Sequence, residues 1–431
     1  MSDANNLKQK EKQMEEKKEV LIRELYGTDE QSMERLDDVK RNFQKRFQCE
    51  QAEFFSAPGR TELIGNHTDH NGGLVIAASI DKDTIAAAYP NQTDFVRIIS
   101  EGYDEEIVID LSVLAAVAKG NGTKALVAGM MEAVRHYGYE VLGFDAYVST
   151  NVIAAAGVSS SASFEMLICA IVNYFFNKQS MTYVDYARIG QYAENTYWQK
   201  ASGLMDQMAC AVGGTILLDF SDQQQIGCKK MDFSFEESGY SLVIVNTGKG
   251  HANLSHEYSD VPFEMKQVAS ALGVDLLCET DLDMLLAHIS EIENDRATLR
   301  AIHFFEENRR VKRAISAIDG DDIEQLLRWM DESGTSSWEL LQNCYSLEDC
   351  KEQKIPLTLA LSRLFLNQIG AGMCRVHGGG FAGVIMCIVP VQEKEHYITY
   401  ISKYVGKENV YPMNIRKFGA IHLNAGVVDS K

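Results

Sequence analysis

The segment NVIAAAGVSSSASFEM, residues Asn151–Met166, runs from a strand through a loop of small residues directly into a helical pattern. The first N–H groups of such a helix have no partner within it and point toward the loop. Ser159, Ser160 and Ser161 can cap these groups, as serines do in many ordinary helices. The same small side chains also let a phosphate approach the donors, and the helix dipole favours its negative charge. The segment is not a Walker loop, because it has no GxxxxGK[ST] pattern.

A polar, glycine-rich stretch lies further upstream, SAPGRTELIGNHTDHNGG at Ser56–Gly73. A solvated loop has this composition. The apolar pair Leu63 and Ile64 would, however, anchor the stretch against a core, and polar groups held there are suited to reading the hydroxyls of a small ligand. A metal site is an alternative, because His67 and His70 are three residues apart, although no third ligand follows at zinc spacing.

A third stretch, VHGGGFAGV at Val376–Val384, places Gly378, Gly380 and Gly383 in a G-x-G-x-x-G pattern. A dinucleotide fingerprint would open a helix, whereas this run leads into the β-rich GVIMCIV. The context therefore argues against a nicotinamide-dependent dehydrogenase, and the absence of HRD and DFG segments argues against a eukaryotic protein kinase. Two interpretations of the glycine run are left: a turn between strands, or a place where the backbone comes close to a ligand.

Composition narrows the class of protein further. The chain has 431 residues and a formal charge of −20, which excludes a general nucleic-acid binder. Its nine cysteines are scattered without a CxxC pair and are expected to be reduced thiols. The first residues have no apolar core of the kind a signal peptide needs, and no run of 18 apolar residues occurs. We expect a cytoplasmic protein with no membrane partner.

The order of the patterns predicts an α+β protein in two lobes. A charge-dense helical leader spans residues 1–45, an N-terminal lobe spans 46–225, and a C-terminal lobe spans 226–431. Strand patterns dominate up to Val152, and helices are expected over Ser160–Phe176 and Val184–Trp198. The second cycle opens with the strand SLVIVNT, continues with three helical stretches between Leu254 and Cys344, and closes with strands around the glycine run.

In this order and with these separations, the three segments resemble the three motifs of the GHMP kinases, most closely those of the galactokinase family. Residues Arg60–Gly73 resemble the signature GRxNLIGEHTDYNxG, Gly157–Ser163 resemble GLSSSAS, and His377–Gly383 resemble TGGGFGG. A fourth match, GLMDQMA at Gly203–Ala209, resembles the segment that carries the family's catalytic aspartate. The resemblance covers roughly Phe54 to Val389.

The resemblance implies a ribosomal-protein-like N-terminal lobe, a ferredoxin-like C-terminal lobe and an active site between them. It implies an ATP-dependent sugar 1-kinase that uses Mg²⁺ and converts galactose to galactose 1-phosphate. The alternatives are a kinase for a related sugar, such as galacturonate or N-acetylgalactosamine, and a non-catalytic sensor of sugar and ATP. The sensor is disfavoured because such proteins lose residues of the segment Gly157–Ser163, here called the serine loop, and Ser159 to Ser163 are all present in this chain. No protein partner is indicated.

The same resemblance assigns site residues. Asp206 would be the base and Arg60 would stabilise the transferring phosphoryl group. The sugar would contact Asn66, His67, Thr68, Asp69 and Tyr258; the ATP phosphates would contact Ala155, Ala156, Gly157, Val158, Ser159, Ser160 and Ser161; and magnesium would be held by Ser161 and Glu194. Without the resemblance, Asp206 and Glu194 would be ordinary helical acids. A guanidinium neighbour would keep the pKa of Asp206 low, so this group would orient the hydroxyl as much as deprotonate it.

Four positions depart from the family pattern. Asn66 stands where the family has Glu, His70 replaces Tyr, residues 153–156 (IAAA) replace a proline and glycines, and His377 replaces Thr. Methyl groups in the loop cost about 1 kcal/mol each wherever φ is positive. A neutral amide at Asn66 would tolerate a uronate that a carboxylate repels, which leads to the hypothesis that the sugar differs from plain galactose.

Overall fold

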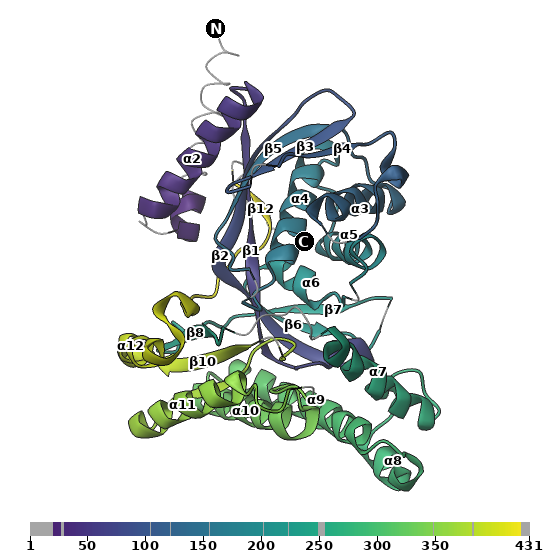
Figure 1. Cartoon of the computed structure of the whole chain (residues 1–431), viewed down its shortest axis with the longest axis vertical. Helices are drawn as coiled ribbons and strands as arrows, with labels where there is room; N and C mark the ends of the chain where they lie inside the picture. Colours follow the sequence, from purple (N-terminus) through teal and green to yellow (C-terminus); the bar gives the residue numbers. More distant parts are fainter. Residues whose placement is uncertain are drawn as a thin grey trace.

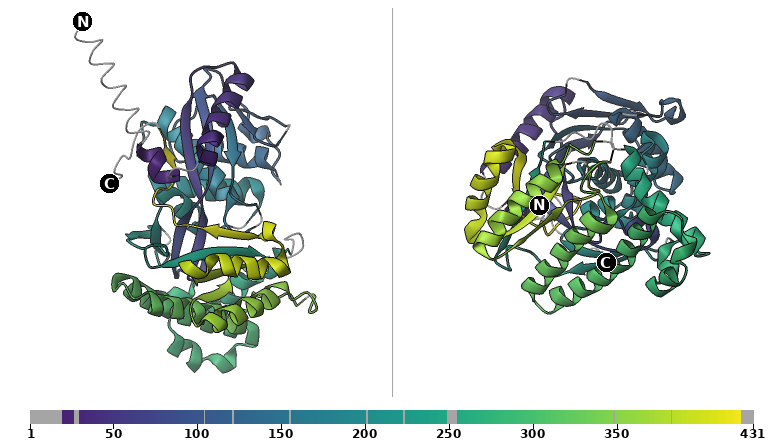
Figure 2. Two further views of the ribbon diagram at one scale, coloured as in Figure 1. Left: turned by 90° about the vertical axis from the view of Figure 1, so that its left-hand side faces the viewer. Right: turned by 60° about the horizontal axis from the view of Figure 1, so that its bottom comes forward.

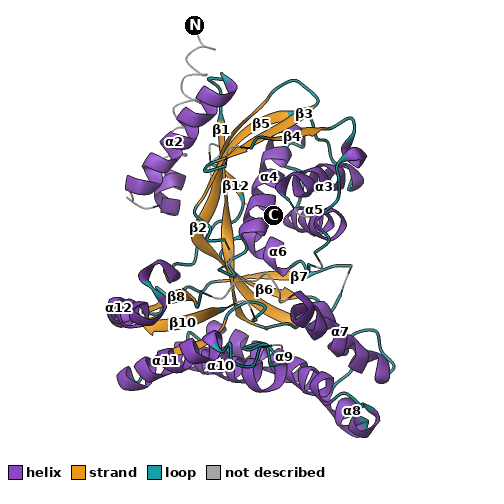
Figure 3. Ribbon diagram, in the orientation of Figure 1, coloured by secondary structure: helices purple, strands orange, loops and turns teal. Residues whose placement is uncertain are grey.

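The computed structural model describes residues 20–26, 30–103, 105–120, 122–154, 156–200, 202–222, 224–248, 255–347, 349–381 and 383–423. Their strands form two sheets, and helices cover both (Figures 1 and 3). The α+β class and the two-lobed architecture predicted from the sequence are confirmed. No helix within these ranges is long and apolar enough to span a membrane. All nine cysteines have free thiols.

The large sheet carries eight strands, six of them in the order β12-β1-β2-β5-β3-β4, with β6 paired to β2 and β7 to β6. Their bounds are β1 Glu53–Ile64, β2 Leu74–Pro90, β3 Phe95–Ser100, β4 Ile107–Asp110, β5 Phe144–Thr150, β6 Thr215–Asp219, β7 Gly227–Met231 and β12 Ile421–His422. All neighbours are antiparallel except β3 and β5. Long, paired β1 and β2 extend toward the second lobe (Figure 1).

Helices cover both faces of the large sheet. Helices α3 (Thr123–His136), α4 (Ser160–Phe176), α5 (Tyr183–Ala193) and α6 (Met205–Val212) lie on one side, and α2 (Glu30–Phe47) lies on the other (Figure 1). Apolar residues of α2 such as Val39 and Phe43 pack with the sheet, which confirms a helix in the charged leader. Residues 1–19 of the leader lie outside the described part of the chain.

The small sheet is antiparallel, in the order β11-β8-β10-β9. Its strands are β8 Tyr240–Asn246, β9 Met373–Val376, β10 Val384–Pro390 and β11 Val410–Met413. The remaining helices are α7 Ser255–Ala271, α8 Leu282–Ala287, α9 Asp295–Asp319, α10 Ile323–Ser336, α11 Lys354–Ile369 and α12 Lys394–Val405. One sheet face packs on α11 and α12, and the other shares a core with α9, α10 and the end of β1 (Figure 2).

The segment expected as a loop at Ser56–Gly73 begins as a strand. Arg60 and Glu62 belong to β1, in which every residue after Glu53 is buried. A strand buried on both faces lacks the alternation of polar and apolar residues by which strands are usually found. The pairing with β2 shifts register between Pro58 and Arg60 and again between Glu62 and Ile64. These irregularities change the directions of side chains locally, and they flank Arg60 and Glu62.

The sheets also bear on the predicted lobe boundary. Strands β7 and β12 both fall within residues 226–431, yet both belong to the large sheet. We therefore propose that the boundary lies between Met231 and Tyr240, with the last strand returning to the N-terminal lobe. A core that contains Leu63, Val158 and Ile244 joins the two lobes.

Candidate active site

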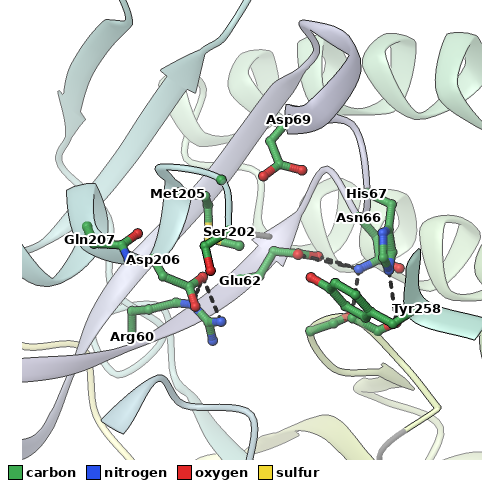
Figure 4. A pocket seen from close by; sticks show the side chains of 13 residues that line it. Arg60, Glu62, Asn66, His67, Asp69, Ser202, Met205, Asp206, Gln207 and Tyr258 are labelled. Carbon is green, nitrogen blue, oxygen red and sulfur yellow. Dashed lines mark hydrogen bonds and ion pairs between the residues drawn. The ribbon is translucent and has the colours of Figure 1, made fainter. Parts of the chain in front are cut away.

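A polar pocket lies where the two lobes meet (Figure 4). About 500 Å³ of space not filled by protein atoms lies within it, part of which is open to solvent. Its lining comes from β1 and the turn after it, the segment around α6, helix α7 and the last glycine run. The lining residues are Arg60, Glu62, Asn66, His67, Asp69, Ser202, Gly203, Met205, Asp206, Gln207, Tyr258, Gly378 and Gly379.

Arg60 and Asp206 form an ion pair at one end of this pocket (Figure 4). Nε and Nη2 of Arg60 each lie 2.7 Å from Oδ1 of Asp206. The remaining nitrogen, Nη1, donates to the carbonyl of Gly157, and the backbone N–H of Arg60 donates to Val158 O at 3.1 Å. Strand β1 thus connects the first turn of α6 to the serine loop.

The protein holds the carboxylate of Asp206 ionised. Burial raises the pKa of Asp206, but the charge and hydrogen bonds of Arg60, together with the Ser159 hydroxyl, lower it more, so that its pKa falls below the ordinary value. The side chain keeps 28% of its surface exposed, on the pocket side. Asp206 is therefore a charged acceptor that a ligand hydroxyl can reach.

The serine loop leads into α4, which spans Ser160–Phe176 as predicted. Gly157 and Ser159 both have left-handed backbone, with φ of 67° and 57°. Ser159 occupies the N-cap position but gives its hydroxyl to Asp206 and caps no N–H of the helix. The first turn of α4 therefore has no side-chain cap at that position, which suits an anion site at the helix N-terminus.

Two residues of the loop avoid the expected strain. Ile153 and Ala154 have φ outside the left-handed region, so their side chains do not incur the cost set out above. Ala155 lies outside the described residues.

Oxygen ligands suited to magnesium gather beside the loop. Ser161 Oγ donates to Glu194 Oε1 at 3.1 Å, and Glu194 is 1% exposed. Gln207 Nε2 links Glu194 to a second buried acid, Glu165. Two buried oxygens here, Glu165 Oε1 and Gln207 Oε1, have no hydrogen-bond partner. Mg²⁺ binds oxygen ligands, so these residues fit that ion. Lys200 Nζ lies 2.7 Å from Glu194 Oε1 and forms an ion pair with this carboxylate.

Three residues predicted to contact sugar are hydrogen-bonded within the protein. His67 Nε2 lies 2.9 Å from Gly379 O, and burial lowers its pKa to about 3, so the ring is neutral. Thr68 Oγ1 lies 2.9 Å from Gly65 O and 2.8 Å from Leu74 O, which share its one hydrogen as acceptors, and Thr68 is absent from the pocket lining. The side chain of Asn66 is fully buried. The side chain of Thr68 therefore stabilises the turn after β1.

Asp69 and Tyr258 are open to the pocket (Figure 4). Asp69 Oδ2 lies where a side chain on Gly203 would be, 2.5 Å from the position of a Cβ atom there. The ring of Tyr258 lies on the backbone of Gly379, where a Cβ atom would come within 2.1 Å of it, and packs beside His67 with ring centroids 5.3 Å apart. Two glycines thus allow an acid and an aromatic ring to approach the pocket.

Glu62 is a pocket residue that the sequence interpretation missed. Its carboxylate lies between Asp206 and Tyr258 and accepts from Asn66 Nδ2 at 3.1 Å (Figure 4). Burial raises the pKa of Glu62 to about 7, against the opposing effect of Arg375 and Arg60. The signal was present in the sequence, since the family pattern GRxNLIGEHTD has Asn at this position.

The other departures lie at the edge of the site. His377 Nε2 lies 2.9 Å from Thr61 Oγ1, and its unpartnered Nδ1 faces Gly157, where a Cβ would be 3.0 Å away. His70 Nδ1 lies 2.9 Å from Asn71 Nδ2. In the parts of the chain that the structure describes, no group of three or more His, Cys, Asp or Glu side chains is arranged to hold a metal ion. The alternative of a histidine metal site around His67 and His70 is therefore not supported.

Solved structures share the fold of this chain. Lactococcus lactis galactokinase complexed with galactose superposes with a TM-score of 0.77, covering 89% of this chain and 99% of that one at 24% identity. A mevalonate kinase superposes with a TM-score of 0.60 at 16% identity, covering 85% of this chain and 99% of its own. The residues 125–214 match the model of the GHMP kinases N terminal domain. The fold is that of a GHMP kinase.

Sequence comparisons establish the family. Residues 41–90 match the galactokinase galactose-binding signature. Galactokinase of Clostridium perfringens is 30% identical over 381 residues, covering 85% of this chain and 93% of that protein. Galactokinase of Limosilactobacillus reuteri is 30% identical over 392 residues, covering 87% and 93%. The chain belongs to the galactokinase family of the GHMP kinase superfamily and is a sugar kinase.

Proposed function

We propose that the protein transfers the γ-phosphoryl group of ATP to the anomeric hydroxyl of galactose. One observation carries the proposal: Asp206, held by Arg60, lies between a polar pocket and the serine loop at the start of α4. A hydroxyl bound at Asp206 and a phosphate bound at the loop would be brought together by the same pair of side chains.

Asp206 acts on the sugar hydroxyl. Its carboxylate is ionised and partly exposed, so it can accept the hydroxyl's hydrogen bond and align the oxygen for attack. Because its pKa is low, full proton transfer would come late, as the new P–O bond forms and the hydroxyl becomes more acidic. Orientation is therefore the larger part of its role.

Arg60 acts on the phosphoryl group. Its Nη1 reaches the carbonyl of Gly157 on the serine loop while its other nitrogens hold Asp206, so its charge lies between donor and acceptor. Fixed positive charge there stabilises the negative charge of the transferring group.

The serine loop binds the phosphates of ATP in this proposal. The donors are the N–H groups of the loop and of the uncapped first turn of α4, at residues 156–161. Ser161 and Glu194 would hold Mg²⁺, aided by the unpartnered oxygens of Glu165 and Gln207. A bound ion would supply positive charge that offsets the charge of the phosphates.

Sugars related to galactose are the alternatives. The neutral amide of Asn66 suggested tolerance of a uronate, but Glu62 keeps a carboxyl group in the same pocket. The pocket therefore favours a neutral hexose over galacturonate. A non-catalytic sensor is disfavoured because Arg60, Asp206 and Ser159 form a connected set of the kind a phosphotransferase needs.

Release of ADP by the purified protein tests the proposal. Galactose, galacturonate and N-acetylgalactosamine are supplied separately with ATP and Mg²⁺, and again with EDTA in place of the metal. We expect release with galactose to exceed that with either other sugar and to stop with EDTA. Release that is the same with and without sugar would contradict a sugar kinase reaction on these substrates. The cytoplasmic location stays a prediction, which a fluorescent fusion checks.

A further inference from the structure

The side chain of Asn66 has no hydrogen-bonding capacity left for a ligand. Nδ2 donates to Glu62 Oε1 at 3.1 Å and to Gly378 O at 2.6 Å. Oδ1 accepts from Asn343 Nδ2 at 2.8 Å and from Ser337 Oγ at 3.3 Å. An amide has two donor hydrogens and two acceptor positions, so all four are used. Asn66 is also fully buried, although it borders the pocket.

Glu62 has the capacity that Asn66 lacks. Its Oε1 accepts from Asn66 Nδ2 and, at 3.4 Å, from Arg375 Nη2, while Oε2 has only a long contact of 3.4 Å to the same Asn66 nitrogen. A carboxylate accepts at about four positions, so acceptor sites on Oε2 remain for a donor in the pocket. The side chain borders the pocket and is directed into it (Figure 4).

The two positions have exchanged their residue types relative to the family pattern. In GRxNLIGEHTDYNxG, the amide stands at the position of Glu62 and the carboxylate at the position of Asn66. Here the carboxylate is on β1 and the amide is on the following turn, and the two side chains are hydrogen-bonded to each other. The exchange keeps one acid and one amide in the pocket, but the acid is at position 62 instead of position 66.

We propose that Glu62 is the residue that determines sugar specificity in this chain, by accepting a hydrogen bond from a sugar hydroxyl, and that Asn66 is a positioning residue that holds Glu62 without touching the sugar. This inference rests on the proposed sugar kinase function. It replaces the hypothesis that loss of the acid at position 66 opens the pocket to a uronate.

The charges around the pocket support this role. Glu62 and Asp69 border the pocket, as does the ion pair in which Arg60 and Asp206 offset each other's charge. Arg375 lies behind Glu62 and spends its other nitrogens on the carbonyls of Leu63 and Val376. A ligand carboxylate would face the acids Glu62 and Asp69, and Arg60 among the lining residues is already paired with Asp206, whereas sugar hydroxyls would meet acceptors.

The test uses Glu62→Gln, Asn66→Glu and the double exchange Glu62→Asn/Asn66→Glu. Assays run at about pH 8, where a carboxyl group with a pKa near 7 is ionised. For Glu62→Gln we expect KM for galactose to rise at least tenfold, KM for ATP to stay within about twofold, and the ratio of kcat/KM for galactose to that for galacturonate to fall at least tenfold. The double exchange should have a KM for galactose close to that of the wild type. Asn66→Glu alone should not lower this KM, because it places two acids side by side.

Matched measurements separate this inference from the proposed function. Glu34→Gln, at an exposed position of α2, is the control for a change of carboxylate to amide. Thermal unfolding checks that each variant folds, and calorimetric titration with galactose measures binding independently of turnover. If the wild type phosphorylates galactose while Glu62→Gln leaves galactose KM and the sugar ratio unchanged, the inference is overturned and the function stands. If the wild type binds galactose without turnover, a weaker affinity of Glu62→Gln still supports the inference, and an equal affinity overturns it.

Discussion

Two nitrogens of Arg60, Nε and Nη2, lie 2.7 Å from the same oxygen of Asp206, and the other oxygen of that carboxylate accepts the hydroxyl of Ser159. The acid therefore has fixed partners from β1 and from the serine loop, 146 and 47 residues away in the sequence. Because the third nitrogen of Arg60 binds Gly157 O, one guanidinium sets the distance between the acid and the loop. The predictions below follow from this connection and from the charges around it.

Replacement of Asp206 by Asn should remove turnover while leaving binding in place. The amide keeps the shape of the side chain but loses the charge that orients the sugar hydroxyl and accepts its proton. We expect kcat to fall on the order of 10³-fold, with galactose and ATP affinities within about threefold of the wild type. Steady-state kinetics and calorimetric titration measure the two quantities.

Asp37→Asn is the control, because Asp37 is an exposed acid on α2. Its kcat should equal that of the wild type. A drop in kcat of less than tenfold for Asp206→Asn would show that the carboxylate has no central role.

Replacement of Arg60 by Lys should weaken catalysis and move its pH dependence. An ammonium group cannot hold both Asp206 and the carbonyl of Gly157 as the guanidinium fork does. We expect kcat to fall on the order of 10²-fold. Arg60 lowers the pKa of Asp206, so its loss raises that pKa and activity is lost at a higher pH on the acid side.

The pH profile of kcat, measured from about pH 4 to pH 8, checks this shift. Arg328→Lys, at a largely exposed arginine of α10, should leave the profile unchanged. An acid limb at the same pH in Arg60→Lys and the wild type would contradict the electrostatic role assigned to Arg60.

Glu62→Gln should become more stable than the wild type as pH rises. The folded protein raises the pKa of Glu62 from 4.5 to about 7 through burial, so ionisation of this group costs stability once pH exceeds its unfolded pKa. The glutamine variant avoids that cost, which reaches on the order of 3 kcal/mol above about pH 7. The melting temperature of the variant minus that of the wild type should therefore increase between about pH 5 and pH 8. A difference that is constant with pH would mean that Glu62 titrates normally.

Arg35→Met should destabilise the protein without changing turnover. Arg35, on α2, donates to Asp83 Oδ1 at 2.7 Å and to Ser149 Oγ at 3.0 Å, and Asp83 is fully buried. Removing one partner of a buried acid leaves its charge less compensated, although Arg416 still pairs with it at 2.9 Å. We expect a loss of about 2–3 kcal/mol in the free energy of unfolding.

Denaturant unfolding of Arg35→Met and of Arg41→Met measures this effect. Arg41 is an exposed arginine of the same helix, so its replacement should change stability by less than about 0.5 kcal/mol. Equal stability of both variants would show that the leader helix does not contribute through Asp83.

Local patterns predicted those elements whose signal lies within the element. Helix α4 begins at Ser160 and ends at Phe176 as the small-residue loop and the apolar run that follows indicate. Strands β8 and β10 were likewise predicted from continuous apolar runs. Helices α3, α11 and α12 were not predicted. In the case of α3, the sequence on both sides of the helix has the residue pattern of strands.

The missed part of the site depends on contacts between distant residues. Arg60 and Glu62 interrupt the apolar pattern of β1, so the strand looked like a loop, and only its burial between the two lobes explains them. Asn66 was expected to contact sugar because the family resemblance assigns a sugar contact to that position of the motif. Its partners Ser337 and Asn343 come from a segment more than 270 residues away, which no local pattern reveals.

Phosphorus NMR of the product formed from ATP and galactose tests the central claim most directly. The proposed reaction, in which Asp206 and Arg60 bring the anomeric hydroxyl to the phosphate at the serine loop, predicts a spectrum with a phosphate coupled to the C1 proton of the sugar, appearing as ADP appears. A phosphate on another hydroxyl, or inorganic phosphate alone, would contradict the account.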